Sequence, residues 1–142
     1  MSPRTTLGLL LLASFLFNII PPSPSLAQTS VDLALVLAVD ISPSMDVEEQ
    51  ELQRQGFVEA FRSPEVHNAV RKGSYGQIAV MYVEWAGAAQ QEIIIPWTVI
   101  AQPADSLTFY AHLTGSSIHR GNFTSISAAI DFGVRQLRES TV

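Results

Sequence analysis

The run from Val31 to Val39 constrains the fold of this chain more than any other segment. It reads Val-Asp-Leu-Ala-Leu-Val-Leu-Ala-Val and, apart from Asp32, it is apolar at odd and even positions alike. Because successive side chains of a strand point to opposite faces, both faces of such a strand must be covered. Strands of this kind belong to parallel sheets flanked by helices. The segment therefore predicts a layered α/β domain.

The segments that follow fit an α/β order. Pro96 lies inside an apolar run over residues 91–100 and cannot donate to a sheet, so we place that strand at a sheet edge. Its short connection to the preceding strand makes the two an antiparallel hairpin. We expect a mostly parallel sheet flanked by helices, with these elements after Asp40: a helix capped by Ser44 or Asp46, a short helical turn from Ser63-Pro64, strands over 77–85 and 91–100, a helix over 103–113, and a last helix capped by Thr124.

Two of these helices carry apolar arcs that predict which side packs on the sheet. Gly56 on the first arc indicates a close approach of that helix to the sheet. The arc of the first helix consists of Leu52, Gly56, Phe57, Ala60 and Phe61. The last helix has the cleanest helical period in the chain, with Ile126, Ala129, Ile130, Gly133, Val134 and Leu137 on one side.

The first 27 residues have the pattern of an export signal. Arg4 supplies a positive charge, residues 7–20 are uncharged and largely apolar, and Ser25-Leu26-Ala27 precedes Gln28. This arrangement predicts a signal peptide over residues 1–27, cleaved after Ala27. The alternative is an uncleaved anchor, but residues 7–20 span only about 21 Å as a helix, short of the roughly 30 Å hydrocarbon core. We expect a secreted or periplasmic protein, without a membrane segment after cleavage, whose single domain covers residues 28–142.

Composition excludes several classes of function. Apolar residues make up 47% of the chain and charged residues 15%, enough for a buried core. The net charge is −5 and the cations are scattered, which argues against a nucleic-acid partner. The absence of cysteine excludes disulfides, thiolate metal sites and a cysteine nucleophile. The three histidines lie far apart in the sequence and lack the spacing of metal ligands.

The segment Asp40-Ile41-Ser42-Pro43-Ser44 carries the strongest chemical signal. It follows the end of the first strand, where open α/β sheets bind their ligands. One carboxylate with neutral hydroxyls at two-residue spacing is a hard-oxygen set suited to Mg²⁺ or Mn²⁺, and Thr124 could add a third hydroxyl. The alternative is a strand-end turn whose serine merely caps the next helix.

These residues resemble the Asp-x-Ser-x-Ser signature of von Willebrand factor A (vWA) domains, where it forms the metal-ion-dependent adhesion site. The segment from Gly121 to Ile126 is similar to the second loop of that family, in which a threonine completes the ligand set. The resemblance implies a vWA/Rossmann-like fold and a Mg²⁺ or Mn²⁺ cofactor. It also implies that Ser42 and Ser44 bind the metal directly, that Asp40 acts through water and by orienting them, and that Thr124 contributes.

Other segments, including Val83-Glu84-Trp85 and Ile95-Pro96-Trp97-Thr98, resemble a family of exported bacterial vWA-like proteins of unknown function, DUF1194. In the vWA pattern another parallel strand follows the last helix and ends in an aspartate that binds the metal. The sequence stops at Val142 before such a strand. We therefore expect the N-terminal portion of a vWA-like domain, an incomplete fold, and metal binding weakened by the missing aspartate.

Three functions remain as alternatives. The resemblance favours a binding module, in which the metal accepts an acidic side chain of an unknown protein ligand. A second reading is a Mg²⁺-dependent phosphate-handling enzyme with Asp40 as nucleophile, disfavoured because such enzymes place a second acid two residues on, where this chain has Ser42. A third is a fragment without function. We expect no enzymatic activity. Whether Glu84, His119 and Arg120 approach the site or belong to the core and a solvated loop stays open.

Overall fold

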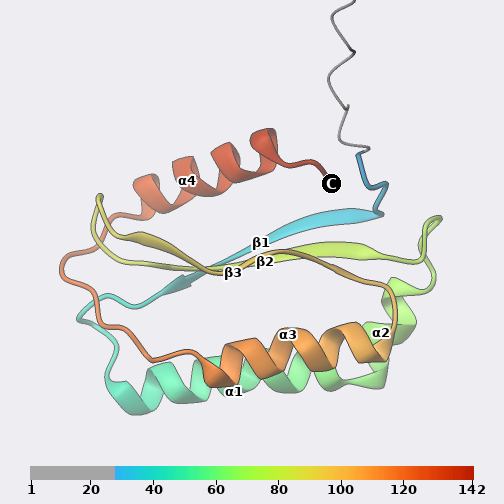
Figure 1. The fold of residues 1–142 in the computed structure, drawn as a ribbon. Helices are drawn as coiled ribbons and strands as arrows, with labels where there is room; N and C mark the ends of the chain where they lie inside the picture. Colours follow the sequence, from blue (N-terminus) through green and yellow to red (C-terminus); the bar gives the residue numbers. More distant parts are fainter. Residues whose placement is uncertain (1–27) are drawn as a thin grey trace, which may run out of the picture.

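The computed structural model describes residues 28–142, so the predicted signal peptide lies outside the described residues. One sheet lies between a layer formed by α1, α2 and α3 and a single helix, α4, on the opposite face (Figure 1). None of the helices within residues 28–142 is long and apolar enough to cross a membrane. The elements are β1 (Leu33–Asp40), α1 (Val47–Arg62), α2 (Pro64–Val70), β2 (Ile78–Trp85), β3 (Gln91–Ile100), α3 (Pro103–Gly115) and α4 (Ile126–Glu139).

The sheet has the order β1-β2-β3. β1 and β2 pair in parallel, with Asp40 opposite Trp85 at their carboxyl ends. β2 and β3 pair antiparallel, with a change of register around Tyr82. The α/β class and the antiparallel hairpin are confirmed, and β3 lies at the edge as Pro96 predicts. The sheet of the described residues is mixed, with one parallel and one antiparallel pairing.

The core lies between the sheet and the pair α1 and α3. The rings of Phe61 and Phe109 are 4.7 Å apart, and Phe57 meets Tyr82 edge-on at 5.5 Å. Aromatic pairs at these separations add to the stabilisation from burying apolar surface. The buried cluster consists of Val39, Val58, Phe61, Val80, Tyr82, Ile95, Ile100, Phe109 and Leu113.

The predicted inner arc of α1 is wrong in part. Leu52 is 71% exposed, and a Cβ added at Gly56 would have no atom within 4 Å, so Gly56 makes no close approach to the sheet. The helix is rotated so that its buried residues are Gln50, Arg54, Val58 and Phe61. The physical reason is an ion pair: Arg54 contacts Glu84 inside the domain, and this contact places the polar side of the helix toward the sheet.

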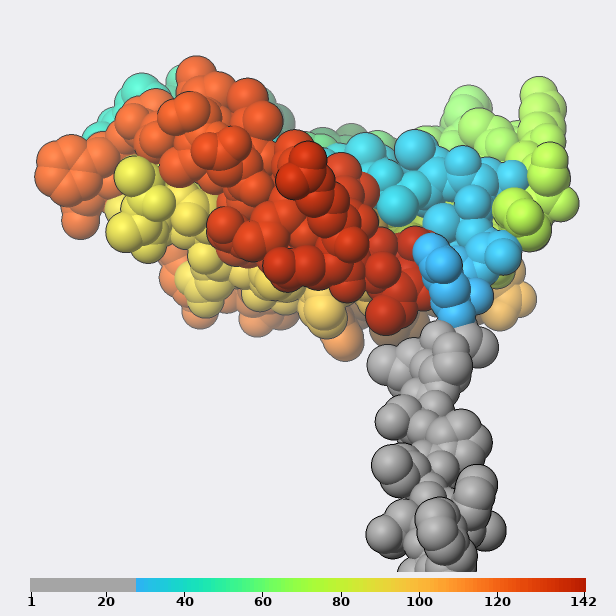
Figure 2. All heavy atoms as spheres, turned by 90° about the horizontal axis from the view of Figure 1, so that it is seen from above, coloured from blue at the N-terminus to red at the C-terminus, as the bar shows by residue number. Residues whose placement is uncertain are grey.

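The apolar side of α4 faces β1 only in part. Ala129 is buried, and a Cβ at Gly133 would lie 3.8 Å from Cγ1 of Val36. Figure 2, seen from the α4 side, shows residues of β1 still visible in light blue beside the red helix. A groove of about 470 Å³ lies between the two elements. Four apolar side chains of the predicted face remain between 40% and 62% exposed, namely Ile126, Ile130, Val134 and Leu137.

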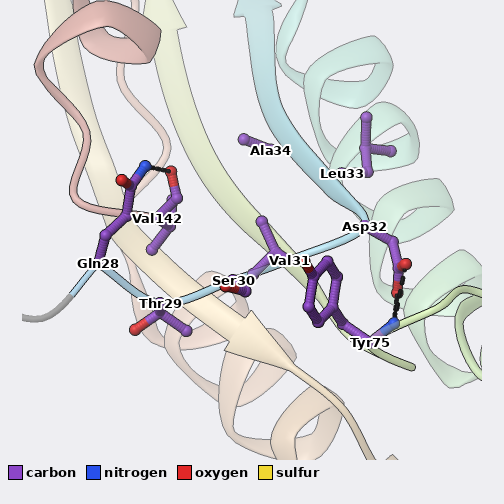
Figure 3. A pocket seen from close by; sticks show the side chains of 9 residues that line it. All are labelled: Gln28, Thr29, Ser30, Val31, Asp32, Leu33, Ala34, Tyr75 and Val142. Atoms are coloured by element: carbon purple, nitrogen blue, oxygen red, sulfur yellow. Dashed lines mark hydrogen bonds between the residues drawn. The ribbon is translucent and has the colours of Figure 1, made fainter.

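Asp32 fixes the start of β1. Its carboxylate accepts hydrogen bonds from the backbone N–H of Tyr75, at 3.0 and 3.1 Å (Figure 3). It also accepts one from the backbone N–H of Gln77, at 3.2 Å. These backbone donors, Tyr75 first, lower the pKa of Asp32 because they favour its charged form. The one polar residue of the first apolar run therefore ties β1 to the turn before β2.

Candidate functional site

Three of the predicted metal ligands lie together at the carboxyl end of β1. The backbone N–H of Ser42 donates to Oδ1 of Asp40 at 2.7 Å, and Oγ of Ser42 lies 3.0 Å from Oγ of Ser44. Ser42 is fully buried and Ser44 is exposed, so the hydroxyl pair reaches from the interior to the surface. The N–H of Ile41 donates to the carbonyl of Trp85 at 2.9 Å, which fixes the loop against the end of β2.

Asp46, rather than Ser44, caps α1. Its side chain accepts from the N–H of Glu49, and the Glu49 side chain accepts in return from the N–H of Asp46. This reciprocal capping box satisfies two backbone donors at the start of the helix. The Ser44 hydroxyl is therefore not used as a helix cap.

A second loop, residues 116–125, lies against the first. The N–H of Gly121 donates to the carbonyl of Ile41 at 2.8 Å, and Arg120 donates to the carbonyl of Met45 at 3.4 Å. A Cβ at position 121 would lie 2.0 Å from Cβ of Ala86, closer than side-chain atoms can approach. The second loop therefore passes so close to Ala86, the residue after β2, that position 121 requires glycine.

Thr124 lies on this second loop and is exposed. Within residues 28–142 it has no hydrogen bond to Asp40, Ser42 or Ser44, although its loop is held against theirs. The prediction that Thr124 caps the last helix is wrong: the cap is Ser125, whose Oγ accepts from the N–H of Ala128 at 3.4 Å. The residue before Thr124, Phe123, has a φ of 71°, which strains a residue that has a side chain.

A buried ion pair supports the second loop from beneath. Arg54 pairs with Glu84, which is 2% exposed, and the same guanidinium donates to the carbonyls of Ser116 at 2.6 Å and Ser117 at 3.1 Å. The sequence argument missed Arg54. Two features of the sequence could have indicated the pair. Arg54 lies on the same side of its helix as Val58, and Glu84 lies inside a strand that is otherwise apolar on both faces.

Glu84 and His119 meet beside the candidate site. Nδ1 of His119 lies 3.2 Å from Oε2 of Glu84 and 3.6 Å from Oε2 of Glu92. With Ile41, these residues line a pocket of about 460 Å³. Burial, followed by the charge of Glu84, raises the pKa of Tyr82 to about 12. The open question from the sequence is thus answered for Glu84 and His119, which share a pocket wall with the loop that follows β1.

The arrangement at the end of β1 can hold a hard cation through oxygen atoms. Among residues 28–142 no three His, Cys, Asp or Glu side chains are grouped for metal binding, so any site here depends on hydroxyl oxygens. Two ligands at right angles on an ion with bonds of about 2.1 Å lie about 3.0 Å apart. The Ser42 and Ser44 hydroxyls form a hydrogen bond at 3.0 Å, and the same separation would suit that geometry.

Comparison with known protein families gives a match over most of the chain. The family model described as "Protein of unknown function (DUF1194)" matches residues 30–142. A search of curated proteins gives no match. The matched range includes both loops of the candidate site and all seven elements of the fold. The wider resemblance to vWA domains stays a prediction.

Proposed function

The chain belongs to the DUF1194 family, whose function is unknown, and from that premise we propose that it is an exported, vWA-like protein-binding module. The module would hold Mg²⁺ or Mn²⁺ with Asp40, Ser42, Ser44 and Thr124. The observation that carries the proposal is the pair of Ser42 and Ser44 hydroxyl oxygens, 3.0 Å apart at the carboxyl end of β1.

Each of the four residues has a separate part in this proposal. Ser42 and Ser44 would bind the metal directly through Oγ. Asp40 would orient Ser42, whose N–H already donates to its carboxylate, and would accept a hydrogen bond from metal-bound water. Thr124 would contribute from the second loop, which is joined to the first by the hydrogen bond from Gly121 to Ile41.

The chemistry of the ligand set suggests the kind of partner. One carboxylate and three neutral hydroxyls leave one of the two charges of a divalent ion uncompensated, so the ion attracts a further anionic oxygen. An acidic side chain of a protein ligand supplies one. We propose binding rather than catalysis, because Oδ1 of Asp40 is engaged by Ser42 and because position 42 holds a hydroxyl in place of a second acid.

Titration of the full chain with Mn²⁺, followed by calorimetry, tests the metal site. We expect saturable binding that Asp40→Asn abolishes. Asp46→Asn is the matched control, because asparagine also caps helices and Asp46 is outside the proposed ligand set. The proposal fails if Mn²⁺ does not bind with saturation, or if the two aspartate variants bind it equally well.

A further inference from the structure

A second pocket lies at the end of the domain away from the candidate metal site. The last turn of α1, the short helix α2 and the first turns of α3 meet there (Figure 1), and they enclose about 320 Å³. Phe61 and Leu107 form apolar parts of the wall. This volume is in the range of pockets that bind small molecules.

The remaining side chains of this pocket give it a positive character. Its lining includes two guanidinium groups, Arg62 and Arg71, and the imidazole of His67, and none of its lining residues is acidic. The chain as a whole has a net charge of −5. Clustered cations in a concave site raise the local concentration of anions. The pocket is therefore lined by positively charged side chains although the protein as a whole is negatively charged.

His67 has hydrogen-bonding capacity that the protein does not use. It is only 8% exposed, and no hydrogen bond within residues 28–142 involves its ring. The buried side-chain atoms without a partner in the described residues belong to Gln50 and Ser106, so the ring nitrogens of His67 are not sealed from the pocket that the residue lines. An imidazole held mostly inside the domain, with its nitrogens open to a pocket, is suited to donate to a bound ligand.

The two arginines retain donors as well. Arg62 lies over the ring of Tyr110, with Cζ 5.3 Å from the centroid. Arg71 donates to Oδ1 of Asn68. A guanidinium has five N–H donors and binds oxyanions with two parallel hydrogen bonds. Both side chains are therefore able to bind an oxyanion without giving up their present contacts.

We propose that this pocket binds a small organic oxyanion, a carboxylate or phosphate group on a compact apolar body. Arg62, His67 and Arg71 bind the oxyanion, while the apolar body lies against Phe61 and Leu107. The pocket and the candidate metal site are at opposite ends of the domain, so this binding is independent of the metal proposal.

Calorimetric titration of the full chain with phenylacetate and with phenyl phosphate tests the pocket. Phenylacetamide, which has a similar shape without charge, is the neutral control. We expect saturable binding of at least one anion, at least tenfold tighter than the amide and weaker at high salt. The two anions distinguish a carboxylate site from a phosphate site. Binding of the amide as tight as that of both anions, or no saturable binding of either anion, would overturn the proposal.

Two further measurements locate the binding. Arg71→Ala should weaken binding at least tenfold, whereas Lys72→Ala, the neighbouring exposed cation outside the pocket lining, should change it less than twofold. In NMR spectra the ring signals of His67 should shift on addition of the anion, and those of exposed His112 should not. Equal losses in the two variants, or equal shifts of the two histidines, would show general attraction to surface charge instead.

Discussion

Arg54 of α1 and Glu84 of β2 form an ion pair inside the domain, and the Arg54 guanidinium also donates to the carbonyls of Ser116 and Ser117. One side chain thereby joins the first helix, the second strand and the loop that leads to Thr124. Both charged groups are buried, so the loss of one would leave the other without its main partner in a site with little access to solvent. The position of the second loop of the candidate site thus depends on a contact made beneath it.

Removal of one partner of this pair should be costly. Arg54→Met leaves Glu84 charged and buried without its main partner, and we expect a loss of about 3–5 kcal/mol in the free energy of unfolding. The double variant Arg54→Met/Glu84→Leu should recover part of that loss. Urea unfolding measures both, with Gln55→Ala as an exposed control on the same helix. A single variant as stable as the control would contradict this account of the pair.

Gly121→Ala should separate the two loops of the candidate site. The added methyl group would meet Cβ of Ala86 at 2.0 Å, so the hydrogen bond from Gly121 to Ile41 must lengthen or break. We expect a destabilisation of about 1–3 kcal/mol, together with faster hydrogen exchange of the Gly121 amide.

Gly56→Ala is the matched control and should have the opposite sign. It lies mid-helix in open space, where alanine is favoured over glycine by about 0.5–1 kcal/mol. If both glycine variants changed stability in the same direction, steric contact at position 121 would not be the cause.

Substitution of Thr124 and of Ser125, neighbours on the second loop, should affect metal binding and stability separately. Thr124→Val removes a hydroxyl that caps no helix, so we expect unfolding within about 0.5 kcal/mol of wild type and weaker Mn²⁺ binding. Ser125→Ala removes the cap of α4, so we expect a loss of about 1 kcal/mol and little change in Mn²⁺ affinity. Thermal unfolding and Mn²⁺ titration of both variants test the pattern, which would be refuted if the two effects were exchanged.

Asp32 and Asp105 should make stability depend on pH in the acidic range. Backbone N–H donors lower both pKa values from 3.8, chiefly Tyr75 for Asp32 and Ala101 for Asp105. The unfolded chain therefore binds more protons than the folded one, so this stabilisation is present above pH of about 4 and is lost as pH falls through the folded pKa values. Asp32→Asn and Asp105→Asn should each flatten the acid limb of a curve of unfolding free energy against pH. Curves parallel to that of wild type would refute this assignment.

The elements were predictable from local patterns because each pattern reports a local constraint. The two-faced apolar run of β1 gave an α/β sheet, and Pro96 with the short turn before β3 gave an antiparallel edge hairpin. The loop from Asp40 to Ser44 was predictable as a unit for the same reason, since its three polar side chains follow one strand end within five residues.

The rotation of α1 and the support of the second loop were not predictable in this way. An apolar arc counts hydrophobic residues, and it therefore placed Leu52 inside and overlooked Arg54. The pairing of Arg54 with Glu84 joins residues on different elements, and no spacing within α1 reports it. The cap of the last helix is Ser125 and not Thr124, and Phe123 just before them has a positive φ, neither of which composition indicates.

The contact between Gly121 and Ile41 determines at which stage of folding the proposed metal site is complete. Its two halves come from opposite ends of the described chain, and neither loop alone contains the proposed ligand set. A chain that had formed only its first strand and helix would hold Asp40, Ser42 and Ser44 without Thr124. In the proposed binding module, partner binding would therefore require that folding has brought the second loop against the first.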